Sequence, residues 1–218
     1  MNRLRFSLLC LITAAWVYSA GDAAFAQTDV DFIKQDTVEL LRQVGAFVKS
    51  SNAKKNEATR IIGVLGMDPF DGVNSKGQPV NHLDEMAREY NAEAAKDNRR
   101  RIVIQRFASA ETYRRCHLLF VSSKSATNDM ADTPEARLAA ALKIAKESKL
   151  NDPVLVVSDT VGFAKRGSPL NYYLETASDG SVGVRTELNP DAAKQIGFDM
   201  INPQYIERIL AGKGRIVK

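Results

Sequence analysis

Arg60-Ile61-Ile62-Gly63-Val64-Leu65-Gly66 is a short apolar run that ends in glycine. A run without polar residues at alternate positions is typical of a β-strand that helices bury on both faces. Three similar runs follow, at residues 101–107, 117–122 (HLLFVS) and 153–158 (PVLVVS). Four buried strands of this kind predict a mainly parallel sheet.

Segments with helical spacing of apolar residues separate these strands. One helix is predicted over residues 32–48, before a polar loop over residues 50–59. A second begins at Asn81, which can cap it, and a third begins at Thr133-Pro134. Because helices alternate with parallel strands, right-handed crossovers should place helices on both faces of the sheet.

The end of the chain has a different pattern. Residues 171–176 and 181–188 flank Asp179-Gly180, a dipeptide favoured at the tight turn of an antiparallel hairpin. Short helices are predicted to begin at Asn189-Pro190 and Asn202-Pro203. The expected fold is therefore a single α/β domain with a mainly parallel sheet, helices on both faces and a C-terminal antiparallel hairpin.

The first 26 residues have the features of a secretory signal peptide. Two arginines precede an apolar run from Phe6 to Val17, and Ala24-Phe25-Ala26 fits a small-x-small cleavage signal. The apolar run is shorter than the roughly 20 residues that cross a bilayer. We therefore expect cleavage after Ala26, a periplasmic protein, and a domain formed by residues 27–218.

Charge gives little support for binding to nucleic acid or membranes. The formal net charge is +4, and residues of both signs are interspersed along the 218 residues. The densest basic cluster is Arg99-Arg100-Arg101, where a predicted strand begins. We expect a solvated sheet edge there, and contact with an anionic partner is the alternative.

Residues for catalysis or metal binding are scarce. Cys116 and His117 are neighbours on a predicted strand, so their side chains point to opposite faces and cannot form a dyad. Cys116 is the only cysteine after the leader, and burial is its expected state. Gly63 and Gly66 resemble part of a dinucleotide-binding motif, but helix packing explains them better. We predict no enzyme activity, no cofactor and no metal site; a thiol-dependent enzyme that uses Cys116 is the alternative.

Loops that follow parallel strands meet at one edge of the sheet, where open α/β sheets bind ligands. Ordinary turn chemistry is the alternative role for these loops. We also expect that Asp159→Ala and Phe163→Ala would weaken binding and leave folding largely intact. The candidate ligand-binding or partner-binding residues are Gly66, Asp68, Phe70, Ser122, Ser158, Asp159, Gly162 and Phe163.

Several segments together resemble the YfiR family of exported regulators. They are the opening helix IKQDTVELLRQVGAFVKSS, IIGVLGMDPF, RRRIVIQRFASAETYRRCHLLFVSS, PVLVVSDTVGF and LNPDAAKQIGFDMINPQYIERIL. Their order and spacing carry the resemblance, which covers nearly the whole chain after the leader. The chain departs from the family in having Ser50-Ser51 where a Trp-Pro pair is common, and in lacking a cysteine pair for an internal disulfide.

The resemblance implies an α/β periplasmic domain without enzyme activity. Its best-known member restrains a membrane diguanylate cyclase, and so cyclic di-GMP output, by binding the enzyme's periplasmic region. The expected partner is therefore a membrane signalling protein of the diguanylate cyclase or histidine kinase type. The alternative is a periplasmic receptor for a small molecule, or an accessory protein of an outer-membrane uptake system. The sequence leaves the oligomeric state open.

Overall fold

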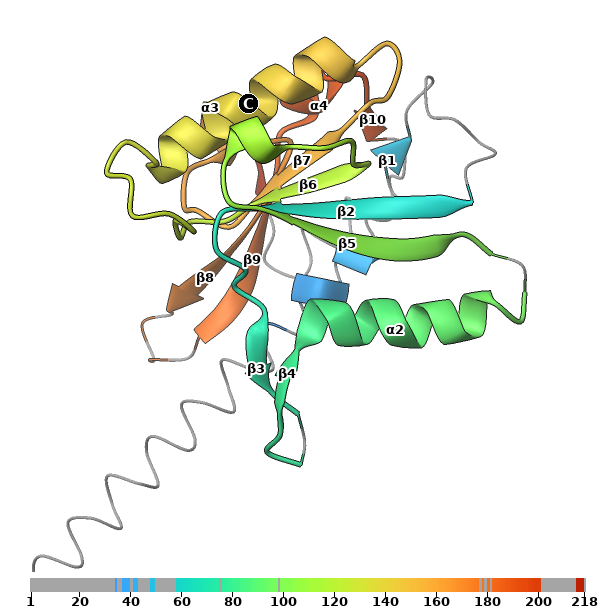
Figure 1. The fold of residues 1–218 in the computed structure, drawn as a ribbon. Helices are drawn as coiled ribbons and strands as arrows, with labels where there is room; N and C mark the ends of the chain where they lie inside the picture. The colour runs from blue at the N-terminus through green and yellow to red at the C-terminus, as the bar shows by residue number, and fades with distance from the viewer. Residues whose placement is uncertain are drawn as a thin grey trace, which may run out of the picture.

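The predicted α/β fold is confirmed by a computed structural model (Figure 1). The structure describes residues 34, 37–39, 41–42, 48–49, 58–74, 76–97, 99–176, 178, 180, 182–200 and 215–217. Within this part of the chain, one sheet has seven strands in the order β11-β9-β8-β7-β6-β2-β5. These strands are β2 (Thr59–Leu65), β5 (Arg101–Phe107), β6 (Leu118–Val121), β7 (Leu155–Ser158), β8 (Leu170–Thr176), β9 (Val182–Leu188) and β11 (Arg215–Ile216).

The four strands predicted from apolar runs form the parallel centre of this sheet. β2 pairs in parallel with β5 on one side and with β6 on the other, and β6 pairs in parallel with β7. β8 continues the parallel order and then returns antiparallel as β9, so the predicted hairpin is confirmed. Gly180 has φ +82° in the hairpin connection, a conformation that glycine adopts without strain.

Helices lie on both faces of the sheet. They are α2 (His82–Ala94), α3 (Pro134–Ser148) and α4 (Pro190–Gln195), with short 3-10 helices η1 (Ala110–Thr112) and η2 (Ala164–Arg166). Figure 1 shows α3 and α4 on one side of the sheet and α2 on the other, beside β5. The predicted caps are present: Asn81 accepts hydrogen bonds from the backbone of α2, and Thr133 and Asn189 do so for α3 and α4.

Two small antiparallel ladders were not predicted. One joins β3 (Asp71–Val73) to β4 (Pro79–Asn81), and the other joins β1 (Val48–Lys49) to β10 (Asp199–Met200). Val48 was predicted as the last residue of the first helix, and that assignment was wrong because Val48 pairs with Met200. A contact between distant segments has overridden the local helical pattern there.

Several predictions lie wholly or partly outside the described residues. The leader (residues 1–26), most of the polar loop after residue 50 and the helix from Asn202 are in this group. Of the first predicted helix, the described residues 34, 37–39 and 41–42 are helical. No helix in the described part of the chain is long and apolar enough to cross a membrane.

Gly63 shows how tightly the centre of the sheet packs. A Cβ atom on Gly63 would lie 2.8 Å from Phe107 Cε2 and 3.1 Å from Cys116 Sγ. Side chains therefore fill the space beside this glycine, which accounts for its place in a buried strand.

Candidate functional site

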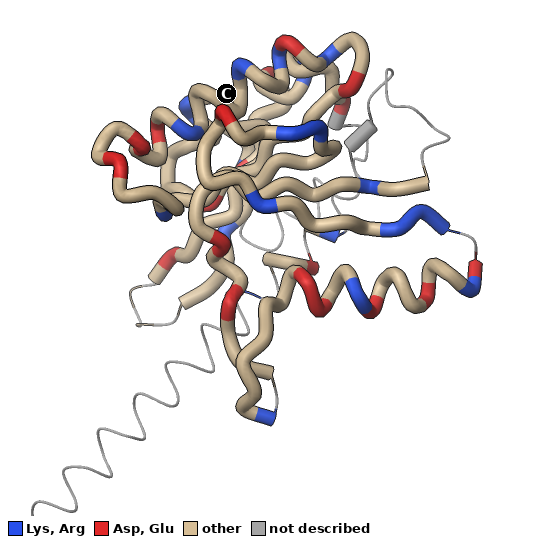
Figure 2. The backbone as a smooth tube through the Cα atoms, viewed as in Figure 1, with Lys and Arg blue, Asp and Glu red and all other residues tan. Residues whose placement is uncertain are grey.

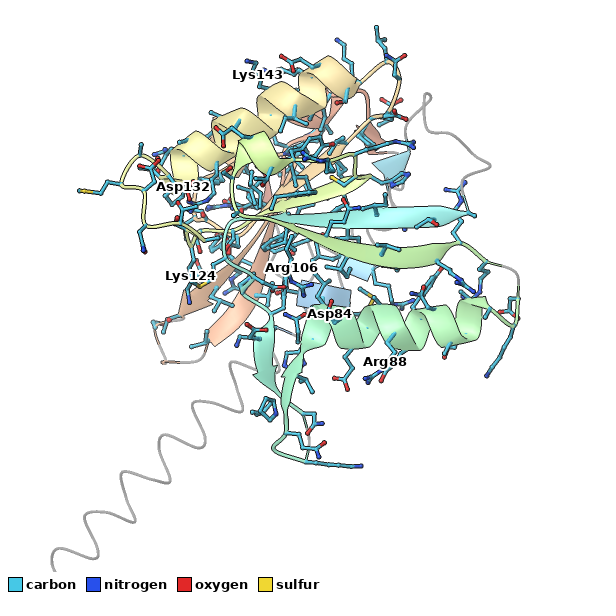
Figure 3. The ribbon with its side chains drawn as sticks, viewed as in Figure 1. Asp84, Arg88, Arg106, Lys124, Asp132 and Lys143 are labelled. Carbon is cyan, nitrogen blue, oxygen red and sulfur yellow. The ribbon has the colours of Figure 1, made fainter. Side chains whose placement is uncertain are left out.

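The loops after β2, β6 and β7 form one connected surface at the carboxyl ends of the parallel strands. We call this surface, formed by residues 66–70, 122–133 and 159–169, the carboxyl edge. Met67 N donates to Lys124 O at 2.9 Å, which joins the first loop to the second. Ser123 Oγ donates to Asp159 Oδ2 at 3.2 Å, which joins the second loop to the third. Figure 3 labels Lys124 and Asp132 on the second loop.

Both predicted aromatic residues point into the protein. Phe70 is 2% exposed, and its ring centroid lies 5.1 Å from that of Phe120 in the core. Phe163 is 1% exposed and belongs to the same hydrophobic core. The expectation that Phe163→Ala would leave folding intact therefore conflicts with its position, since truncation of a buried ring leaves a cavity.

The two predicted serines are also buried and serve the loop backbones. Ser122 Oγ accepts a hydrogen bond from Lys124 N at 3.2 Å. Ser158 Oγ lies 2.8 Å from both Ser168 Oγ and Asn171 Oδ1. These contacts satisfy polar groups inside the protein and set the path of the loops.

The two predicted glycines shape the turns. Gly66 has φ +97°, and a Cβ atom there would lie 2.6 Å from Lys124 O, so the contact between the first two loops requires glycine. Gly162 has φ +82° and has open space where a Cβ atom would be.

Asp68 holds the start of the first loop through its carboxylate. Oδ1 accepts from Phe70 N at 2.8 Å, and Oδ2 accepts from Arg106 Nε at 2.7 Å and from Asn81 Nδ2 at 3.0 Å. Arg106 also donates to Asp84 Oδ2 at 2.9 Å, and Figure 3 labels both residues between β5 and α2. Asp68 therefore links β2, β5 and the cap of α2 at one point.

Among the predicted site residues, Asp159 has the most strongly shifted pKa. Burial raises the pKa of its carboxyl group to about 6, while hydrogen bonds from Ser123 and Thr160 act in the opposite direction. The group that ties two loops of the carboxyl edge together therefore changes its charge near neutral pH.

Exposed apolar side chains lie on all three loops of the carboxyl edge. Met67 is 49% exposed, Met130 is 95% exposed and Val161 is 64% exposed. The sequence prediction chose neighbouring residues that prove to be mostly buried. A large apolar residue within a polar, turn-rich loop was the available signal for these three positions.

Cys116 and His117 are held in structural contacts. Cys116 is 2% exposed, and burial raises the pKa of its thiol to about 12, so little thiolate exists at neutral pH. His117 Nδ1 accepts a hydrogen bond from Ile61 N at 3.0 Å. These surroundings do not favour nucleophilic chemistry at Cys116. Among the described residues, no group of three or more His, Cys, Asp or Glu side chains is placed to hold a metal ion.

A family model described as YfiR/HmsC-like matches residues 34–202. The chain belongs to the YfiR/HmsC-like family. The predicted resemblance is thus confirmed, and the matched region contains the whole carboxyl edge. Membership supports a periplasmic regulator of diguanylate cyclase activity, rather than an enzyme, as the general class of this YfiR/HmsC-like protein.

Other comparisons add only distant similarities. No curated protein matches the chain. A conserved domain protein from Vibrio cholerae has 16% sequence identity and a TM-score of 0.42, over 84% of this chain and 60% of that one. An ABC domain in complex with L-Trp from Streptococcus pneumonia has 13% identity and a TM-score of 0.42, over 85% of this chain and 60% of that one. The chain thus spans 60% of the length of each structure.

Proposed function

We propose that this protein is a non-enzymatic periplasmic module that restrains a membrane diguanylate cyclase by binding the cyclase's periplasmic region. Membership of the YfiR/HmsC-like family supports this class of function. The observation that carries the proposal is the exposure of Met67, Met130 and Val161 on connected loops of the carboxyl edge. Exposed apolar side chains that come together on a surface mark a candidate protein interaction site.

The connections between the loops suit this surface to docking. Because the Met67–Lys124 and Ser123–Asp159 hydrogen bonds hold the three loops together, little ordering is needed when a partner binds. Methionine side chains adapt to irregular apolar surfaces, so Met67 and Met130 can fill gaps against the partner. Complete burial of one such side chain contributes roughly 1.5–3 kcal/mol, which corresponds to about a tenfold to a hundredfold change in Kd.

Regulation then follows from differential affinity. A signal molecule that binds only the free module would draw it away from the cyclase and raise cyclic di-GMP. A difference of about 1.4 kcal/mol between the two states changes the binding constant tenfold.

The test begins with the partner. The tagged protein, exported with its own leader, is crosslinked in the cell envelope, and captured membrane proteins are identified by mass spectrometry. We expect a diguanylate cyclase whose purified periplasmic region binds the protein directly. A folded bait that captures no membrane signalling protein would contradict the proposal and favour the small-molecule receptor.

The binding surface is tested with matched substitutions of exposed apolar residues. Val161→Ser and Met67→Ser should weaken binding to the cyclase region by at least tenfold and raise cyclic di-GMP in cells. Leu150→Ser is the control, because Leu150 is 72% exposed and lies after α3, at the opposite edge of the sheet. Equal binding by all three variants would rule out the carboxyl edge as the interface.

A further inference from the structure

The opposite edge of the sheet, where β2 and β5 begin, carries a group of basic residues. Figure 2 shows Lys and Arg gathered at the start of β5 and near the start of β2. Arg101 N donates to Ala58 O at 2.9 Å, and Arg60 is in register with Ile102, so the first residues of the two strands are held side by side. We call Arg60, Arg99 and Arg100 the arginine cluster.

Arg60 has an unusual environment for a guanidinium group. Its side chain is half-buried, and within the described part of the chain no carboxylate or other acceptor forms an ion pair or hydrogen bond with it. By contrast, Arg99 Nη2 lies 3.0 Å from Asp97 Oδ2, and Arg106 pairs with Asp68 and Asp84. Arg60 therefore bears a partly desolvated charge that none of the described residues neutralises.

Two further arginines, Arg99 and Arg100, add positive charge close to Arg60. Burial lowers the pKa of the Arg60 guanidinium, Tyr90 raises it, and the adjacent positive charge of Arg100 lowers it again. Arg100 directly precedes β5, next to Ile102's neighbour Arg101, and Ile102 is the register partner of Arg60, so the Arg100 charge lies close enough to act on Arg60. The Arg99 guanidinium lies over the Tyr90 ring, 5.4 Å from its centroid. Arg60 and Arg99 therefore both lie near Tyr90, and Arg100 lies near Arg60.

An unpaired charge in a partly buried position costs folding free energy, and such costs are concentrated at binding sites. The planar guanidinium group can donate two parallel hydrogen bonds to a carboxylate or a phosphate group. Part of the Arg60 side chain remains accessible to solvent, so an anion can reach it.

We infer that Arg60, together with Arg100, binds an oxyanion, a carboxylate or phosphate group of a small soluble molecule. Tyr90 and Arg99 form the side of this site. The site lies at the opposite end of the strands from the carboxyl edge, so this inference does not depend on the proposed function.

The experiment uses the full-length protein exported with its own leader and purified from the periplasm. Inorganic pyrophosphate and citrate serve as the phosphate and carboxylate probes. Binding is measured by thermal unfolding and isothermal titration calorimetry. Samples without probe contain sodium chloride at the same ionic strength, so that salt screens the charges of the protein equally in all samples. We expect at least one probe to bind saturably and to raise the unfolding temperature of the wild-type protein.

The matched variants are Arg60→Gln and Arg88→Gln. Both remove one positive charge, but Arg88 is an exposed residue of α2 that pairs with Glu85. Arg60→Gln should abolish saturable binding and should be at least as stable as the wild type without probe, whereas Arg88→Gln should bind normally. Arg60→Lys keeps the charge without the planar fork and should bind at least tenfold more weakly.

Two results would overturn the inference. One is that neither probe binds saturably to the wild-type protein. The other is that Arg60→Gln binds a probe as tightly as the wild type does. If Arg60→Gln does not fold, the Arg60→Lys comparison decides: unchanged affinity in that folded variant rules out recognition by the guanidinium group.

Discussion

The Ser123 hydroxyl lies 3.2 Å from the Asp159 carboxylate, so the loop after β6 is held to the loop after β7 by a group that titrates near neutral pH. The connected surface of the carboxyl edge depends on this contact. Because the pKa of Asp159 is about 6, the charge of this contact changes between mildly acidic and neutral pH.

The raised pKa of Asp159 predicts a definite pH dependence of stability. Its pKa is about 6 in the folded protein, against an ordinary value of 3.8. Between these two values the folded state holds a proton that the unfolded state has lost, so stability falls as pH rises. The contribution is fully present below pH 3.8, is lost as pH rises through about 6, and amounts to about 3 kcal/mol.

Asp159→Asn isolates this contribution. The neutral amide can still accept a hydrogen bond from Ser123 and does not titrate. Chemical denaturation should give similar stability for the variant and the wild type near pH 4, and a more stable variant at pH 7.5. A constant difference across this range would exclude Asp159 as the titrating group.

Phe163 and Val161, two residues apart, should respond in opposite ways to substitution. Phe163 is 1% exposed in the core, so Phe163→Ala should lower the free energy of unfolding by about 3–5 kcal/mol. Val161 is 64% exposed, so Val161→Ser should change stability by less than about 0.5 kcal/mol. Urea denaturation measures the free energy of unfolding of both variants. Comparable losses of stability would contradict the burial of Phe163 and the exposure of Val161.

Much of the fold could be predicted because it depends on local patterns. The continuous apolar runs identified β2, β5, β6 and β7, and the bounds predicted for β5 agree with the structure at both ends. The caps Asn81 and Thr133 were found because short polar side chains before an amphipathic stretch satisfy free backbone N–H groups. Val48 was misassigned because its strand depends on Met200, which lies far away in the sequence.

The sequence predicted where the carboxyl edge lies in the fold. It did not predict which side chains of these loops are buried and which are exposed. Topology alone brings together the loops that follow parallel strands. Phe70 and Phe163 turn inward while Met67, Met130 and Val161 face solvent, and the packing of the whole core decides which residue takes which direction. Arg60 was not predicted as a site residue because in the sequence it stands only as the first residue of an apolar strand.

Gly63 and Gly183 offer a matched test of packing, since both lie in strands of the same sheet. Gly63→Ala places a methyl group 2.8 Å from Phe107 Cε2, so the ring must move, at a cost of about 1–3 kcal/mol. A Cβ atom on Gly183 would have no neighbour within 4 Å, so Gly183→Ala should be neutral or stabilising. Thermal unfolding compares the two variants, and a Gly63→Ala protein as stable as Gly183→Ala would show that the interior is loosely packed.

Arg215 and Glu187 form an ion pair that joins β11 to β9 at the edge of the sheet. The Glu187 side chain is fully buried, accepts a hydrogen bond from Asn171 Nδ2 at 2.9 Å and forms an ion pair with Arg215 of β11. Arg215→Gln would leave a buried carboxylate without its cation, which costs roughly 3–5 kcal/mol. β11 also depends on the Val217 N to Leu188 O hydrogen bond of 2.7 Å, so hydrogen exchange at Val217 should become faster in this variant.

The double variant separates charge burial from loss of the strand. Glu187→Gln combined with Arg215→Gln removes both charges and keeps groups that can hydrogen-bond to Asn171. It should be more stable than Arg215→Gln alone, because the unpaired charge is responsible for most of the loss. If the double variant is as unstable as Arg215→Gln, the contacts of the Arg215 side chain, rather than its charge, hold β11 in place.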